Sequence, residues 1–84
     1  NPDFKRTEIS QREMDVLSLI CEAKTADEIG LELNISKRTV DTHRQNLLLK
    51  TSSRNIIALV VYAFSLDLVP IKRVPRYSHT DTLA

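Results

Sequence analysis

Residues 25–47 read TADEIGLELNISKRTVDTHRQNL, and this stretch decides the fold. Thr25 and Glu28 have the spacing of a capping box, in which the threonine side chain accepts from the N3 amide and the glutamate reaches back to the cap. Ser36 is a second N-cap residue. We therefore expect two helices, over residues 26–33 and 37–50. The turn between them is too short for an antiparallel hairpin, but it suits two helices that cross steeply.

Two further helices are expected around this pair. Ser10 and Glu13 form another capping box, which starts a helix over 11–22. An apolar helix over 54–66 precedes Pro70 and Pro75, which disfavour helix beyond it. No run alternates with period two for more than a few residues, so strands are not expected. The sequence predicts an all-α, four-helix bundle-like helix-turn-helix domain over residues 8–69, with the motif at about 26–45 and an extended or disordered tail over 70–84.

Composition narrows the class of protein. The 84 residues are 42% hydrophobic and 27% charged, enough for one small domain. A single cysteine excludes an internal disulfide framework and favours a reducing, cytoplasmic setting. The longest apolar run, Ile56 to Phe64, is far shorter than the roughly 20 residues that span a bilayer, and no secretory signal is present, so no membrane partner is expected. Because the chain begins with Asn1, we expect it to be a piece of a longer protein.

Charge is unevenly distributed along a chain whose formal net charge is only +1. Residues 8–32 carry seven acids and two bases, whereas residues 36–54 carry five bases and one acid. A basic stretch in a neutral chain indicates a face that binds a polyanion. A solvated charged helix has the same composition, so the charge alone leaves both readings open.

The helix predicted over 37–50 has two unlike faces. At 100° per residue, Val40, Leu47 and Thr51 form one stripe that points inward. The opposite side carries mostly hydrogen-bonding side chains: Arg38, Asp41, Thr42, Gln45 and Leu49. Such side chains can read the donor and acceptor code of base edges in the major groove of DNA. Lys37 and Arg44 would supply attraction to phosphates that does not depend on sequence.

Three blocks of sequence, residues 12–17, 25–29 and 35–47, resemble the LuxR-type, GerE-like helix-turn-helix of the NarL/FixJ and LuxR transcription regulators. The resemblance covers roughly residues 8–69. It implies a four-helix effector domain of a cytoplasmic bacterial regulator, with its third helix as recognition helix. It also implies dimeric binding to two half-sites of double-stranded DNA, under an N-terminal receiver or ligand-binding domain. RNA polymerase is a further candidate partner, and no cofactor, metal or small-molecule ligand is expected in this domain.

Site residues are carried over from the resemblance position by position. Asp41, Thr42 and Gln45 would face bases. Arg38 is included with them because it lies on the same side of the helical wheel. Seven residues would lie near the phosphate backbone: Thr25, Ser36, Lys37, Thr39, His43, Arg44 and Lys50.

The chain departs from the family pattern at three points. Ala23 stands where members often have glycine, and Asp41 where they often carry a basic residue. A carboxylate repels phosphates but accepts from cytosine N4, so the base preference should differ from that of relatives with lysine. Ser52 replaces a common glycine and lacks its ready left-handed geometry, so the end of the third helix is expected to fray or run differently.

The helix predicted over 54–66 is apolar on every side, and three short helices cannot cover it. With Val60 set at zero on the helical wheel, Ile56, Ile57, Ala63 and Phe64 fall within about 60° on either side, and Ala58, Val61 and Tyr62 fall at about 100–200°. The apolar side left uncovered predicts a homodimer through this helix about a two-fold axis, as is common in the resembling family. The predicted interface is Ile57, Ala58, Val61 and Tyr62. The alternative is a half-exposed apolar helix on a monomer.

Two other classes of function remain open. A helical protein-interaction module of the sigma-factor-like type would bind a protein with little response to salt. An enzyme would need a pocket and an organised catalytic set, and no such set stands on adjacent elements, so no enzyme is expected. Cys21 is interpreted as a small buried hydrophobe rather than a redox sensor. His43 is either a phosphate contact or a partly packed side chain, and no second ligand at metal-binding spacing accompanies it.

Overall fold

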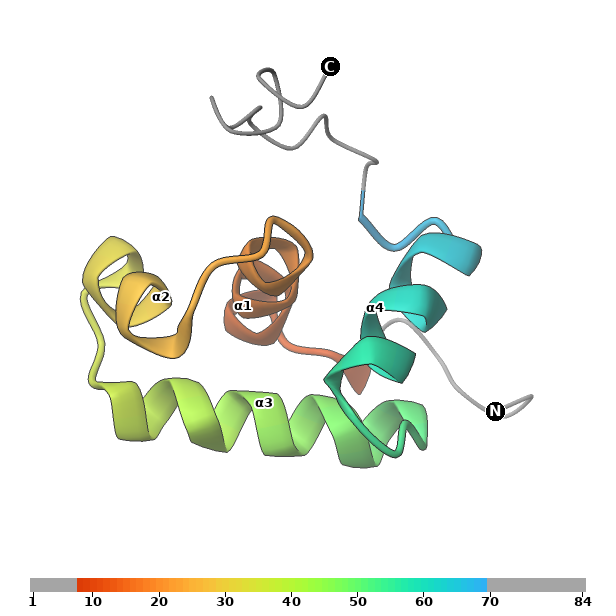
Figure 1. Ribbon diagram of the computed structural model, residues 1–84. Coiled ribbons are helices and arrows are strands. Elements are labelled where there is room, and N and C mark those ends of the chain that lie inside the picture. Colours follow the sequence, from red (N-terminus) through yellow and green to blue (C-terminus); the bar gives the residue numbers. More distant parts are fainter. Residues whose placement is uncertain (1–7, 70–84) are drawn as a thin grey trace, which may run out of the picture.

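The computed structural model describes residues 8–69, which form four helices joined by short connections (Figure 1). The helices are α1 (Gln11–Cys21), α2 (Ala26–Leu33), α3 (Lys37–Thr51) and α4 (Ile56–Ser65). Within 8–69 there is no strand, so the predicted all-α class is confirmed. The tail expected over 70–84, which contains His79, lies outside the described residues.

Capping boxes begin α1 and α2. Ser10 Oγ accepts from the Glu13 amide at 3.1 Å, and Glu13 Oε1 accepts from the Ser10 amide at 3.0 Å. Thr25 and Glu28 make the same reciprocal pair at 3.2 and 2.8 Å. Each box satisfies amides that have no partner within the helix, and both helix starts predicted from these residues are confirmed.

Single side-chain caps begin the other two helices. Ser36 Oγ accepts from the Thr39 amide at 3.0 Å, as predicted. Asn55 Oδ1 accepts from the Ala58 amide at 2.8 Å. Because Asn55 is itself the cap, α4 begins two residues after the predicted start at 54.

The core forms where α3 runs across the other helices, which lie together on one side of it (Figure 1). The largest fully buried side chains come from all four helices: Val16, Leu17, Ile29, Val40, Leu47 and Leu59. Thr51 is also buried, and its Oγ1 donates to the Leu47 carbonyl at 2.8 Å, so the hydroxyl does not lack a partner. The inward stripe predicted for α3 is therefore confirmed. No single helix within 8–69 has the length and apolarity to cross a membrane; only α3 and α4 together, across a 61° bend, pass that test.

Two residues other than glycine adopt the left-handed conformation just after α1 and α3. Ala23 has φ 66°, and Ser52 has φ 55°. After α3 the Ser52 amide donates to the Leu49 carbonyl at 3.2 Å and the Ser53 amide to the Leu48 carbonyl at 2.9 Å, the two bonds of a Schellman motif. The expectation that α3 would end differently is wrong, because serine takes the left-handed conformation at a cost of about 1 kcal/mol.

Candidate nucleic-acid interface

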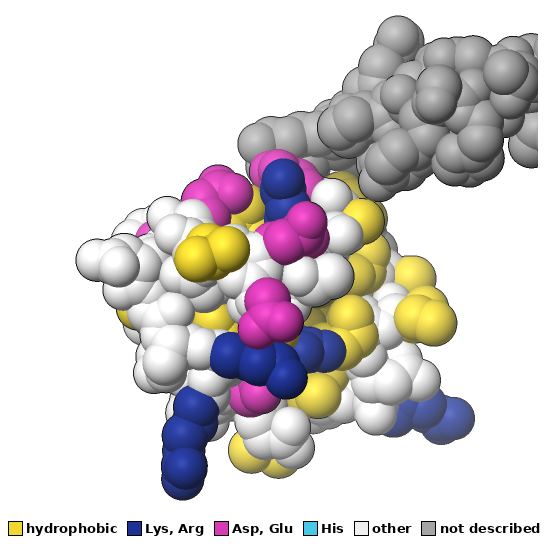
Figure 2. All heavy atoms as spheres, turned by 60° about the vertical axis from the view of Figure 1, so that its left-hand side comes forward, with side chains coloured by type: hydrophobic (Ala, Val, Ile, Leu, Met, Phe, Trp, Pro, Cys, Tyr) yellow, Lys and Arg dark blue, Asp and Glu magenta, His cyan; other side chains and the backbone are white. Residues whose placement is uncertain are grey.

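The side of α3 that faces away from the core is exposed along its length. Its exposed residues are those predicted from the spacing: Arg38, Asp41, Thr42, Gln45 and Leu49. On the other side of the same helix, Val40 and Leu47 are fully buried. In Figure 2 basic side chains lie mainly in the lower part of the view, where α3 runs, and most acidic side chains lie above them. α3 is thus clamped on one side and presents a face of mostly hydrogen-bonding side chains on the other.

Several groups on this face are available for hydrogen bonding. Lys37, Arg38 and Gln45 have no side-chain hydrogen bond or ion pair with any described residue. Thr42 Oγ1 donates to the Arg38 carbonyl at 3.1 Å, so its lone pairs and methyl group remain outward. The first three turns of α3 therefore offer a guanidinium donor, a hydroxyl acceptor and an amide that both donates and accepts.

Asp41 is paired within the face. Its Oδ1 accepts from Arg44 Nη1 at 3.4 Å, one turn along the helix. The side chains are 51% and 34% exposed, respectively. An exposed pair of this length is worth at most about 1 kcal/mol, so water or another charged group can replace either partner.

Arg44 also meets the start of α2. It lines a hollow together with Lys24 and Thr25, although Thr25 lies far from it in the sequence. A hydrogen bond from the Thr25 backbone amide holds the pKa of the Glu28 carboxyl below its usual value, so this acid is ionised in the first turn of α2. A phosphate in this hollow would therefore depend on the two basic side chains. Lys24 was not predicted as a site residue. Its position next to the N-cap of a helix could have indicated it, because a helix N-terminus attracts anions.

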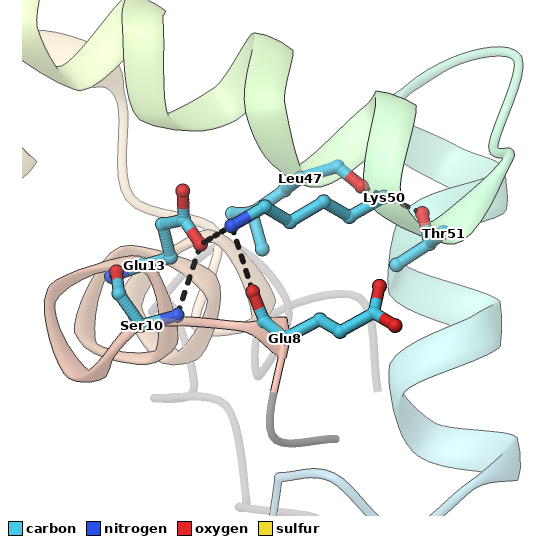
Figure 3. A network of polar contacts seen from close by, with 6 residues as sticks. All are labelled: Glu8, Ser10, Glu13, Leu47, Lys50 and Thr51. Atoms are coloured by element: carbon cyan, nitrogen blue, oxygen red, sulfur yellow. Dashed lines mark hydrogen bonds and ion pairs between the residues drawn. The ribbon is translucent and has the colours of Figure 1, made fainter. Parts of the chain in front are cut away.

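Two residues predicted near phosphates are turned toward α1. Lys50 Nζ donates to Glu13 Oε1 at 2.8 Å and to the Glu8 carbonyl at 2.7 Å (Figure 3). His43 is half-buried, and its Nδ1 is enclosed without a hydrogen-bond partner among the described residues. Of the two roles left open for His43, this placement favours a packed side chain. We leave both residues out of the phosphate set proposed below.

The carboxyl of Glu13 is buried beneath this contact, with the residue only 4% exposed. Burial acts to raise its pKa, but hydrogen bonds from Lys50 and Ser10, together with the charges of Lys50 and His43, outweigh burial and lower the pKa. An ionised carboxylate therefore ties the N-terminus of α1 to the C-terminal half of α3, and so helps to hold α3 against the rest of the domain.

α4 carries a second exposed surface, which is apolar. Ile57 and Val61, one turn apart, are 75% and 62% exposed, whereas Leu59 and Ala63 are fully buried. Ile57 and Val61, both predicted at the dimer interface, lie outside the buried stripe, which is centred on Leu59 and Ala63. Ala58 and Tyr62, also predicted at the dimer interface, are half-buried beside this surface.

Comparison with known proteins identifies the family. Residues 7–63 match the family model described as bacterial regulatory proteins, luxR family. The chain belongs to the luxR family. It is a helix-turn-helix DNA-binding domain of the type found in transcription regulators, as the resemblance implied.

Relatives of this luxR-family domain are longer proteins. It is 44% identical over 61 residues to the transcriptional activator protein SolR of Ralstonia nicotianae, covering 73% of this chain and 26% of SolR. It is 43% identical over 61 residues to the transcriptional regulatory protein LiaR of Bacillus subtilis, covering 73% and 29%. The response regulator protein VraR of Staphylococcus aureus is 35% identical over 61 residues, with the same coverage as LiaR. The matched segment is thus between a quarter and a third of each of these relatives.

The cysteine of the luxR-family domain behaves as a packed side chain. Cys21 is half-buried against the core, and burial, with a smaller effect from the Glu22 charge, raises the pKa of its thiol to about 11. The thiol is therefore protonated at neutral pH, which favours the hydrophobic role over a reactive one. Within 8–69, no group of three or more His, Cys, Asp or Glu side chains is placed to hold a metal ion.

Proposed function

We propose that this domain binds double-stranded DNA in the bacterial cytoplasm, with α3 in the major groove. The observation that carries the proposal is the division of α3 into a buried apolar stripe and an exposed polar face. A groove about 12 Å wide admits a helix, and the exposed face offers the donors and acceptors that base edges require. The base-reading residues proposed are Arg38, Asp41, Thr42 and Gln45.

Phosphate contacts would surround this helix. Lys37 lies in the first turn of α3 with its ammonium group unpaired among the described residues, and Arg44 lies beside Lys24 and Thr25. Ser36 and Thr39 are exposed at the start of the same helix, where their hydroxyls share a hydrogen bond of 2.9 Å. Such contacts orient a protein on the duplex, and base contacts then give it sequence preference.

We further propose that two copies bind together through α4. Ile57 and Val61 expose apolar surface that a second α4, related by a two-fold axis, would cover. Two recognition helices arranged in this way would enter successive major-groove turns about 34 Å apart. Control by an upstream receiver or ligand-binding domain, and contact with RNA polymerase, are proposed only for the longer protein.

Replacing Gln45 and Lys37 separates the two kinds of contact. We expect Gln45→Ala to relax preference at one base position, at a cost of about 1–2 kcal/mol on the preferred duplex. We expect Lys37→Ala to weaken all duplexes alike, and to flatten the slope of log K against log salt concentration by about 0.9. Selection from a random duplex library, followed by fluorescence anisotropy at several salt concentrations, measures both effects.

The same experiment tests the function itself. Glu32→Ala, an exposed change on α2, is the matched control and should leave both the preferred motif and the salt slope unchanged. An unchanged motif for Gln45→Ala would remove its base-reading role. A wild-type chain that shifts no duplex, yet binds a protein with little response to salt, would favour the sigma-factor-like docking module.

Replacing Val61 tests the α4 interface. We expect Val61→Glu to reduce self-association at least tenfold, because it places a charge in a surface that must be desolvated on dimerisation. Sedimentation equilibrium over a range of concentrations measures the effect. Leu31→Glu, a similar change at an 84% exposed leucine of α2, is the control and should dimerise like the wild type. A wild-type chain that stays monomeric at high concentration, both free and on paired half-sites, would contradict the interface.

A further inference from the structure

Asp41 is the only acid on α3, and it stands among the side chains proposed to read bases. The cationic residues of the same helix are Lys37, Arg38, Arg44 and Lys50. A carboxylate between two phosphate backbones is repelled, so Asp41 lowers affinity for DNA in general. It can bind favourably in the groove only where a base edge donates a hydrogen bond to it.

Cytosine is the base that suits this carboxylate. Guanine presents O6 and N7 to the major groove and thymine presents O4, all of which are acceptors, as is the carboxylate. Adenine presents the N6 amine, but the adjacent N7 is an acceptor and repels the second carboxylate oxygen. Cytosine presents its N4 amine with no acceptor on the same base; the O6 acceptor of the paired guanine lies on one side of the amine, and only C5–H lies on the other. Asp41 should therefore favour a C·G pair with cytosine on the strand that it faces.

The pairing with Arg44 links this base contact to the backbone. Arg44 Nη1 lies 3.4 Å from Asp41 Oδ1, and both side chains are accessible enough to change partners. Arg44 also lines the hollow that Lys24 and Thr25 line at the start of α2. The arginine thus lies between two positions: the carboxylate on its own helix and the candidate phosphate position at α2.

We propose that Asp41 and Arg44 form a discriminating pair that opens on a cytosine-bearing half-site; this rests on the DNA binding proposed above. On such a site the cytosine N4 amine donates to Asp41, and Arg44 turns to a phosphate beside Lys24 and Thr25. On any other base Asp41 stays paired with Arg44, and the contact between Arg44 and the phosphate is not made. One base pair therefore controls both a hydrogen bond in the groove and a contact with the backbone.

The test measures salt dependence on two duplexes that differ at one base pair. The 84-residue wild-type chain is used to select a motif from a random duplex library. Affinity for this motif, and for a copy with the C·G pair replaced, is then measured by fluorescence anisotropy at several salt concentrations. We expect the cytosine duplex to bind about tenfold more tightly. We also expect its log–log salt slope to be steeper by about 0.9, since one more phosphate is neutralised.

Two variants separate the parts of the pair. Asp41→Asn should lose the cytosine preference, bind the replaced duplex more tightly than the wild type does, and show equal slopes on both duplexes. Arg44→Ala should still select cytosine, but with equal slopes. The double variant, Asp41→Asn with Arg44→Ala, should discriminate no more than Asp41→Asn alone. Glu32→Gln removes the same charge from an exposed acid of α2 and is the matched control; it should behave like the wild type. Circular dichroism establishes that each variant is folded.

The outcomes distinguish this proposal from the function on which it rests. If Asp41→Asn selects the same motif as the wild type, or if the wild-type slopes are equal on the two duplexes, the discriminating pair is wrong while DNA binding stands. If Arg44→Ala keeps the difference in slope, Arg44 is not the group released. If the wild-type chain selects no motif and shifts no duplex, both proposals are overturned.

Discussion

Gly30→Ala should destabilise the domain by about 3 kcal/mol, even though alanine is the better helix former. A Cβ at this position of α2 would lie 2.7 Å from the carbonyl oxygen of Ile35, and 3.6 Å from the Lys37 amide nitrogen. Both are backbone atoms of the turn into α3, so neither can move aside like the end of a side chain. The higher helix propensity of alanine is worth only about 1 kcal/mol in the opposite direction.

The steric conflict also predicts a functional loss. Relief of the contact requires the start of α3 to move away from α2, and Lys37 and Arg38 move with it. Thermal unfolding should show a decrease in Tm of about 12–24 °C for a domain of this size. Affinity for DNA should fall on all duplexes, even at temperatures where the variant is folded. Leu31→Ala, at the next position of the same helix, is the control and should change Tm by only a few degrees. A variant with the wild-type Tm or a higher one would show that the turn accommodates the methyl group.

The role of Gly30 illustrates what sequence patterns do and do not contain. Helix starts were predictable because a cap acts over four residues, and Ser10, Thr25 and Ser36 each stand at the required spacing. The two faces of α3 were predictable for a similar reason, since 3.6 residues per turn determine which side chains share a side. The close approach of Gly30 to Ile35 depends on the angle at which α3 leaves the turn, which is set by tertiary packing.

Tertiary packing also decides which basic residues remain available for DNA. Lys37, Arg44 and Lys50 carry the same charge in the sequence, and all three were predicted near phosphates. In the fold Lys50 is bound by Glu13, Arg44 is paired with Asp41, and Lys37 has no such partner among residues 8–69. The Glu13–Lys50 pair joins residues 37 positions apart, and no local spacing rule predicts it.

Local sequence rules do not determine the structure at two places. Serine at position 52 was expected to change the end of α3, yet it adopts the left-handed conformation there. The helical wheel of α4 did not show which stripe would be buried, because a helix that is apolar on every side does not indicate which side its neighbours will cover. For α4 the buried stripe became known only from the contacts of Leu59 and Ala63 with the core.

The second large effect is expected at Glu13. Glu13→Ala should lower the free energy of unfolding by about 3 kcal/mol, because it removes a buried carboxylate with three roles. It accepts from the Ser10 amide in the capping box, it accepts from Lys50, and it fills space between α1 and α3. Lys50 is partly exposed and can turn to water, which places the loss at the lower end of the range for a broken buried ion pair.

Glu13→Gln separates the charge from the cap. Glutamine keeps the shape and can still accept from the Ser10 amide, so we expect a loss of only about 1–2 kcal/mol at neutral pH. Since the folded-state pKa of Glu13 lies below the usual 4.5, its ionisation stabilises the fold above pH 4.5, and that contribution disappears as the pH falls through the folded-state value. Chemical denaturation between pH 7 and pH 3 should therefore show wild type and Glu13→Gln converging in stability at the acid end. The Glu28 carboxyl also titrates there, but it is present in both proteins and cancels in the difference. A constant difference across this range would show that the charge of Glu13 does not stabilise the contact between α1 and α3.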